Sequence, residues 1–207
     1  MILYRPAALA GLTALAFSAL PWSSALAEPE PLTPHAFRRL VERVQPCVLK
    51  VVSQPSGFAV LVGVKGELIA DDKVLGKDAV TVAVEVKGER REATLITRDT
   101  ELGLALLRLP DDEYPAASVG EAKNLQRGDA LVGLSFDAKK GPVAEPGHFA
   151  GTRDVKGVTR LRNDVAGPPG TALFNTRGQL VAVHAGRSHA TVAIEELRER
   201  FSKKRPE

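Results

Sequence analysis

Few side chains in the sequence have the type and spacing that catalysis or metal binding would need. Histidine is the commonest metal ligand and general base in proteins, and the chain has four, at His35, His148, His184 and His189. His184 and His189 are five positions apart with Glu195 nearby in sequence, a spacing too loose to indicate a metal site. We expect no metal or other cofactor.

Two further groups invite a chemical interpretation. Asp71 and Asp72 are adjacent carboxylates, but such a pair does not make a calcium-binding loop, and a solvated turn before Lys73 explains it. The single cysteine, Cys47, excludes a disulfide scaffold and a site built from several cysteines. Cys47 opens the apolar run Val48-Leu49-Lys50-Val51-Val52, which favours a buried, inert thiol; a reactive or intermolecular thiol is the alternative.

The composition is that of an ordinary globular protein. With 207 residues, 44% of them hydrophobic and 26% charged, the chain can bury a core, which excludes a disordered, collagen-like or coiled-coil protein. The formal net charge of +3 is too small to indicate a nucleic-acid partner. Eighteen glycines and 14 prolines indicate many turns, which favours an all-β chain.

The first 27 residues have the pattern of a secretory signal peptide. Arg5 supplies the positive charge, residues 7–20 are apolar, and Ala25-Leu26-Ala27 is the small–x–small pattern of a cleavage site. The apolar run of about 14 residues is shorter than the roughly 20 that span a bilayer. We expect an exported chain, periplasmic or secreted, with no membrane span after cleavage; a retained anchor is the alternative.

Two short helices are predicted at the ends of the mature chain. Thr33 suits a helix N-cap and Pro34 the first helical position, so a helix is predicted over 34–45, after a leader that begins at Glu28. Apolar residues at helical spacing predict a second helix over about 194–202, followed by a basic tail.

Short strands are predicted between these helices. Val80, Val82, Val84 and Val86 alternate with more polar residues, the period of a half-buried strand. The predicted strands are 47–53, 57–63, 66–70, 80–86, 91–96, 104–109, 129–134, 147–152, 158–162, 171–175, 179–185 and 190–194. Such spacing indicates a barrel or sandwich. The polar segment 109–113 separates a first half, 46–112, from a second half, 113–207.

The order and local sequence of these segments resemble the trypsin-like fold, especially the HtrA (Deg) protease domain. Ser56-Gly57-Phe58 is similar to the family's Ser-Gly-Phe, and residues 66–70 to the strand before its catalytic His. Residues 99–107 resemble the segment with the catalytic Asp, and 167–173, Gly-Pro-Pro-Gly-Thr-Ala-Leu, stands where the family has Gly-Asn-Ser-Gly-Gly-Pro-Leu. The resemblance implies an all-β fold of two antiparallel six-stranded β-barrels, 46–112 and 113–207, with a short helix at each end.

The same resemblance implies that the catalytic triad is degenerate. A serine protease needs a hydroxyl nucleophile, a histidine base and a carboxylate that orients the base. The corresponding positions hold Pro169, Lys73 and Gly103. An ammonium group is a poor base, and glycine has no side chain. Proline has neither a hydroxyl nor a backbone N–H, so one oxyanion-hole donor is also missing and only the N–H of Gly167 remains.

We therefore interpret the chain as an HtrA-type pseudoprotease with no catalytic residues. It would be an exported binding, scaffolding or regulatory module that holds a protein or peptide in the former substrate cleft. The candidate binding residues are Gly167, Gly170, Thr171, Val183, His184 and Ala185. One alternative is a serine-type hydrolase with a rearranged site that uses Thr171 or a residue that this comparison misaligns. Another is a β-sandwich whose resemblance is coincidental. For His184 a neutral side chain hydrogen-bonded at a strand end is the simpler interpretation.

The export prediction can be tested directly on the mature protein. Cleavage after Ala27 should release a soluble chain that begins at Glu28, because the small–x–small pattern follows the apolar run. N-terminal sequencing of the protein recovered from the exporting cell checks this. A membrane-retained chain that still carries Met1 would contradict it.

Overall fold

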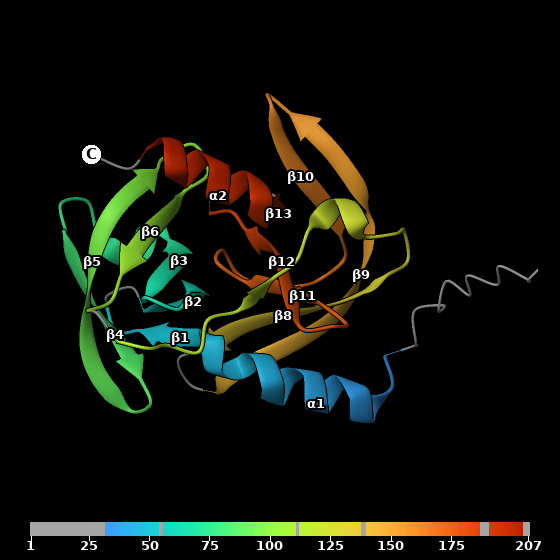
Figure 1. Cartoon of the computed structure of the whole chain (residues 1–207), viewed down its shortest axis with the longest axis horizontal. Helices are drawn as coiled ribbons and strands as arrows, with labels where there is room; N and C mark the ends of the chain where they lie inside the picture. Colours follow the sequence, from blue (N-terminus) through green and yellow to red (C-terminus); the bar gives the residue numbers. More distant parts are fainter. Residues whose placement is uncertain (1–31, 54–55, 111, 138–139, 187–190, 205–207) are drawn as a thin grey trace, which may run out of the picture. The chain divides into compact units, whose positions relative to one another are not determined.

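Two closed six-stranded antiparallel β-barrels make up most of the structure, with a short helix on the N-terminal side and another at the C-terminus (Figure 1). This computed structural model describes residues 32–53, 56–110, 112–137, 140–186 and 191–204. The expected fold class is confirmed, and a two-sheet sandwich is excluded because each set of six strands closes on itself. The predicted signal peptide and its cleavage site lie outside the described residues.

The first barrel joins its strands in the ring order β1-β2-β3-β6-β5-β4, and pairing of β1 with β4 closes it. The alternation predicted for residues 80–86 is confirmed for Val82, Val84 and Val86, which are buried, but Val80 is exposed and lies before the strand. The strands are β1 (Val48–Val51), β2 (Gly57–Gly63), β3 (Glu67–Asp71), β4 (Thr81–Val86), β5 (Glu89–Asp99) and β6 (Leu104–Arg108).

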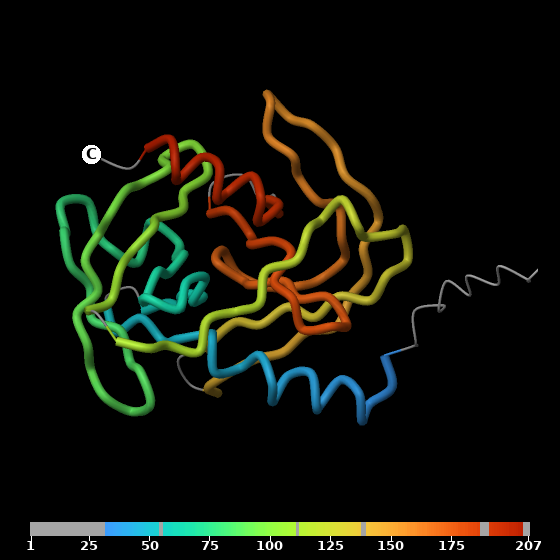
Figure 2. Tube along the Cα trace, in the orientation of Figure 1, coloured from blue at the N-terminus to red at the C-terminus, as the bar shows by residue number. Residues whose placement is uncertain are grey.

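The second barrel follows after the chain crosses from β6, as the tube in Figure 2 shows. Its ring order is β8-β9-β10-β13-β12-β11, and pairing of β11 with β8 and β12 closes it, while β7 adds to β12 in parallel. The strands are β7 (Ser118–Val119), β8 (Ala130–Asp137), β9 (Gly141–Val155), β10 (Val158–Asn163), β11 (Ala172–Asn175), β12 (Gln179–His184) and β13 (Thr191–Ala193).

Strand β9 is much longer than the strand 147–152 predicted from sequence. Its first half holds Pro142 and Pro146 and has no clear polar–apolar alternation, so local pattern does not reveal it. Pairing along the whole length of β8, from Ala130 opposite His148 to Asp137 opposite Gly141, supplies the missing stabilisation. The prediction failed because this pairing is a contact between strands rather than a local property.

One hydrophobic core runs through both barrels. Leu61 and Leu68 of the first barrel belong to the same buried cluster as Val132 and Phe174 of the second. A smaller cluster around Leu131 fills the interior of the second barrel. Neighbouring residues of β8 therefore belong to two different clusters, which explains why its first five residues, 130–134, are all apolar.

Helix α1 (Pro34–Val44) begins as predicted, because Thr33 Oγ1 accepts a hydrogen bond from the Ala36 N–H at 3.2 Å. A 3₁₀ turn, Gln45–Cys47, follows it, so Cys47 precedes the first strand rather than opening it. The Cys47 thiol is buried and donates to the Val44 carbonyl, and burial raises its pKa to about 12. The expected burial of the thiol is confirmed.

The C-terminal helix α2 (Ile194–Lys203) is attached to the first barrel through a buried carboxylate. Asp99, 0% exposed at the end of β5, accepts hydrogen bonds from Arg200 at 3.1 Å and Lys204 at 2.9 Å. Burial alone would raise the pKa of Asp99, but these donors and the Leu102 N–H outweigh it and lower the pKa. None of the helices in the described part of the chain is long and apolar enough to cross a membrane.

We expect Asp99→Asn to lower the free energy of unfolding at pH 7 by about 2 kcal/mol, because it removes the charge that Arg200 and Lys204 share. The Asp99 pKa is lower in the folded state, so the contribution is present above about pH 4 and is lost as the pH falls through the folded pKa. Urea unfolding of both proteins across pH 3–7 measures it.

The matched control is Glu101→Gln, which removes one of the two other carboxylates that contact Arg200, the second being Glu196. The Glu101 side chain is 75% exposed, so its loss should cost less than about 0.5 kcal/mol. Equal losses in the two variants would contradict a special role for Asp99.

Candidate functional site

The positions of Lys73 and Gly103 meet where β3 and β6 come together in the first barrel. Lys73 lies in the 3₁₀ turn Asp72–Leu75 that follows β3, and Gly103 precedes β6. The Asp72 N–H donates to the Gly103 carbonyl at 3.0 Å, which joins the two segments through their backbones. Gly103 has a φ of 68°, a left-handed conformation that favours glycine.

The loop that carries Pro169 reaches this place from the second barrel. A Cβ on Gly170 would lie 3.3 Å from the Phe58 ring and 3.6 Å from the Asp71 nitrogen. A Cβ on Gly186 would lie 2.9 Å from the Gly103 carbonyl oxygen. These close approaches bring the segments that hold Lys73, Gly103 and Pro169 together at the junction of the barrels.

Asp71 is the buried carboxylate of the junction. It is 8% exposed, its Oδ1 accepts the Lys73 N–H at 3.1 Å, and burial raises its pKa against the opposing effect of that hydrogen bond. The solvated turn expected for Asp71 and Asp72 is therefore wrong. Asp71 packs against Gly186, where an added Cβ would lie 2.7 Å from Asp71 Oδ1. Asp72 forms an ion pair with Arg98 at 2.9 Å.

Thr171, the candidate alternative nucleophile, has its hydroxyl in a structural bond. The side chain is 1% exposed, and Oγ1 donates to the Pro168 carbonyl at 2.7 Å. The Thr171 backbone also accepts the His184 N–H at 2.9 Å. This hydroxyl is neither exposed nor directed at a base.

His184 ends β12 directly behind the loop. Its carbonyl accepts the Gly170 N–H at 2.8 Å, and its side chain is hydrogen-bonded to the Gly167 backbone. Burial lowers the pKa of His184, and the bond to Gly167 only partly offsets this. The lowered pKa favours the neutral imidazole, and the contacts of His184 with the Gly167 and Gly170 backbones hold it against the loop.

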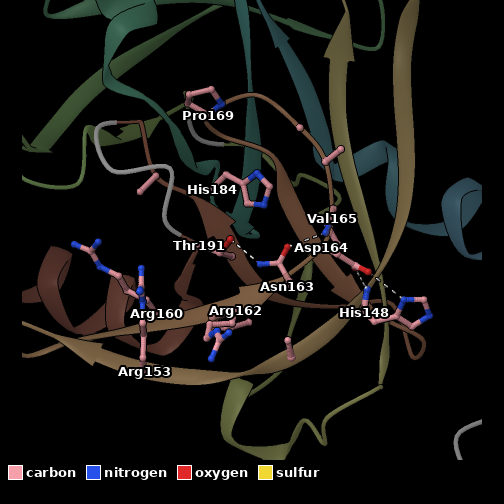
Figure 3. A pocket seen from close by; sticks show the side chains of 15 residues that line it. His148, Arg153, Arg160, Arg162, Asn163, Asp164, Val165, Pro169, His184 and Thr191 are labelled. Atoms are coloured by element: carbon pink, nitrogen blue, oxygen red, sulfur yellow. Dashed lines mark hydrogen bonds and ion pairs between the residues drawn. The ribbon is translucent and has the colours of Figure 1, made fainter.

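A cavity of ≈ 610 Å³ opens beside this loop in the second barrel (Figure 3). Of the candidate binding residues, Gly167, His184 and Ala185 line it, together with Pro169. The remaining three do not line it and are buried, namely Gly170, Thr171 and Val183. The structure thus divides the predicted set into residues that face the cavity and residues that support its wall.

Apart from His184, the polar side chains of the cavity were missed by sequence reasoning. Arg153, Arg160 and Arg162 lie along one side, on β9 and β10 (Figure 3). Asn163 lies between them and the loop, where it donates to Thr191 Oγ1 at 2.8 Å. The available signal was the pair of arginines two positions apart in the predicted strand 158–162, since alternate residues of a strand share a face.

The opposite end of the cavity holds its one described carboxylate, Asp164. Asp164 accepts the His148 backbone N–H and lies 3.5 Å from His148 Nδ1. These interactions lower the pKa of Asp164, chiefly through the backbone bond. The carboxylate is therefore paired locally, and no described ion pair links it to the three arginines.

Two closed barrels with loops converging at their junction define a double-β-barrel domain. Residues 55–183, more than half of the chain, match the family model described as trypsin-like peptidase domain. The chain belongs to the trypsin-like peptidase domain family.

Individual relatives agree with this assignment. A probable periplasmic serine endoprotease, DegP-like, from Hahella chejuensis (strain KCTC 2396) is 27% identical over an alignment of 145 residues, and the match covers 64% of this chain and 30% of that protein. The match thus spans less than a third of that relative's length.

Solved structures share the fold. The HtrA-type protease AlgW, solved with a decapeptide, has a TM-score of 0.68 and 20% identity, and the match covers 81% of this chain and 66% of that one. Deg5 has a TM-score of 0.68 and 16% identity, with 80% and 91% covered. The fold of this chain is therefore similar to that of HtrA-type proteases.

Asp71→Asn should leave the protein at least as stable as the unmodified chain at pH 7, because an asparagine oxygen can still accept the Lys73 N–H without the cost of a buried charge. Burial raises the Asp71 pKa, so its unfavourable contribution appears as the pH rises above about 4, the opposite sign to Asp99. Urea unfolding at pH 4 and pH 7 checks this. A loss at pH 7 as large as that of Asp99→Asn would contradict it.

Proposed function

We propose that this protein is an exported, non-catalytic member of the trypsin-like peptidase family that binds a protein or peptide segment beside the junction of its barrels. The observation that carries the proposal is the chemistry of the three segments that meet there. Lys73, Gly103 and Pro169 occupy the positions that the resemblance to HtrA proteases assigns to the base, the orienting carboxylate and the nucleophile.

None of these residues can take over the role of the residue it replaces. Lys73 is exposed, and an ammonium group has no lone pair with which to accept the nucleophile's proton. Gly103 has no side chain to orient a base. Pro169 has no hydroxyl to attack a carbonyl and no N–H to stabilise the oxyanion. The loss therefore affects both proton transfer and charge stabilisation.

The competing proposal, a hydrolase with a rearranged site, has less support. Thr171 is buried, and its hydroxyl already donates to the Pro168 carbonyl. His184 is hydrogen-bonded to the Gly167 backbone, an arrangement that suits bracing of the loop rather than activation of a hydroxyl. A nucleophile must be within hydrogen-bond reach of its base, and the described contacts of Thr171 and His184 are with backbone groups.

Binding of a peptide is supported by the cavity and by the family. AlgW has been solved with a decapeptide and with a tripeptide, so an HtrA-type protein can hold short peptides. In this chain we assign the contact surface to Gly167, His184 and Ala185, with Gly170, Thr171 and Val183 as the buried wall behind it. An exported location is supported by the signal-peptide pattern and by the word periplasmic in the name of the DegP-like relative.

The purified mature protein should have no serine-hydrolase activity. General acid–base catalysis is worth on the order of 10²–10⁴ in rate, and one oxyanion donor on the order of a further 10²–10³. Labelling with a serine-directed phosphonate and a casein proteolysis assay measure this, with an active trypsin-like protease as positive control. Labelling at Thr171, abolished by Thr171→Val, would promote the rearranged hydrolase.

Restoring the triad provides a second test of the same proposal. Pro169→Ser alone should remain inactive, because no base would activate the new hydroxyl. Lys73→His, Gly103→Asp and Pro169→Ser together should give weak labelling. Activity of the single variant equal to that of the triple variant would contradict the proposed loss of the base.

A further inference from the structure

Three arginines of the β9–β10 hairpin lie on one side of the ≈ 610 Å³ cavity. Arg153 and Arg160 are directly opposite in the register of the two strands, and Arg162 lies two residues further along β10 (Figure 3). Like charges directly opposite in an antiparallel pair destabilise it. The hairpin therefore carries a concentration of positive charge that its own folding does not favour.

These guanidinium groups have no carboxylate partner among the described residues. By contrast, Arg98, Arg108 and Arg200 each form an ion pair with an aspartate or glutamate. Arg160 Nε is also buried, and no described group accepts its hydrogen bond. A buried donor without an acceptor destabilises the folded protein. An acceptor that carries negative charge would satisfy this donor and offset the charge of the neighbouring guanidinium groups.

From these observations we propose that the cavity binds a carboxylate of a peptide, held by Arg160 together with Arg153 and Arg162. The guanidinium fork matches a planar carboxylate and can donate two parallel hydrogen bonds to it. Asp164, the one described acidic residue of the lining, is at the other end of the cavity and is engaged by His148. It therefore does not neutralise the arginines.

The same cavity is lined both by the three arginines and by the residues proposed to contact a peptide. Its lining is continuous from Gly167, Pro169 and His184 at the barrel junction to Arg160 on the hairpin (Figure 3). A segment that lies beside the junction can thus place one acidic side chain, or its own C-terminal carboxylate, among the arginines. The inference rests on the proposed function and names the chemical class of its ligand.

Three fluorescent hexapeptides distinguish the sources of the carboxylate. Each consists of alanine apart from one central residue: glutamate with an amidated C-terminus, glutamine with an amidated C-terminus, and glutamine with a free C-terminal carboxylate. Fluorescence polarisation with the mature chain at low salt should give a Kd at least about tenfold lower for one or both carboxylate peptides than for the neutral peptide, the range expected for charge-assisted hydrogen bonds. Whichever carboxylate peptide binds more tightly identifies the source.

Variants assign the effect to the cavity. Arg160→Gln should reduce the preference for the carboxylate peptide to less than about threefold without lowering the melting temperature, because it also removes the repulsion from Arg153. The matched control is Arg90→Gln, which removes an exposed arginine on β5 of the first barrel and should leave the preference unchanged. An equal drop in both variants would indicate a general charge effect and overturn the assignment.

The outcomes separate this inference from the proposed function. Equal affinity for all three peptides would overturn the carboxylate preference while leaving peptide binding intact. No binding of any of them would count against both proposals. Catalytic labelling of the protein, together with a carboxylate preference, would overturn only the non-catalytic role.

Discussion

The buried carboxylate of Asp99 is the interaction on which the arrangement around the barrel junction depends most. It accepts the N–H groups of Glu101 and Leu102, which shapes the turn before β6, and its own carbonyl accepts the Gly103 N–H at 2.7 Å. The same carboxylate holds Arg200 and Lys204 at the end of the chain. One side chain thus fixes a turn of the first barrel and the helix that follows the second.

The position of α2 matters because this helix continues directly from β13. That strand pairs with both β10 and β12, which carry Arg160 and His184 respectively. Attachment of α2 to Asp99 therefore holds one wall of the cavity against the first barrel. Burying the Asp99 carboxylate in isolation would cost free energy, but four hydrogen-bond donors stabilise its charge. These four bonds fix the turn before β6 and the position of α2 at the junction.

Close backbone approach is the second constraint at the junction. Gly170 and Gly186 stand where a Cβ would contact Phe58 or Asp71, so glycine at these places satisfies packing rather than catalysis. This explains how the double-barrel architecture is compatible with the lysine, glycine and proline that our proposal places at the three triad positions. Packing of the two barrels requires that these loops approach closely. It does not require a hydroxyl, an imidazole or a carboxylate at the positions of Pro169, Lys73 and Gly103.

Sequence reasoning succeeded where the signal is local. The alternation around Val82, the N-cap at Thr33 and the apolar face of α2 each depend on residues a few positions apart, and each is confirmed. The order of the segments also gave the double-barrel class. Contacts distant in sequence were not accessible: the length of β9 depends on its pairing with β8, and the burial of Asp71 depends on Gly186, more than a hundred residues away.

The arginine cluster was hidden for the same reason, since Arg153 and Arg160 become neighbours only through the register of β9 and β10. Its chemistry is consistent with a site that binds without turnover. In an enzyme, interactions that are equal in the ground state and the transition state do not accelerate the chemical step. In the proposed binding module the same interactions are the function, because a strong charge-assisted contact slows dissociation and nothing requires the ligand to be released after a reaction. On these two proposals, the lack of a working triad and the carboxylate-binding cavity together describe a protein that retains a peptide rather than cleaving it.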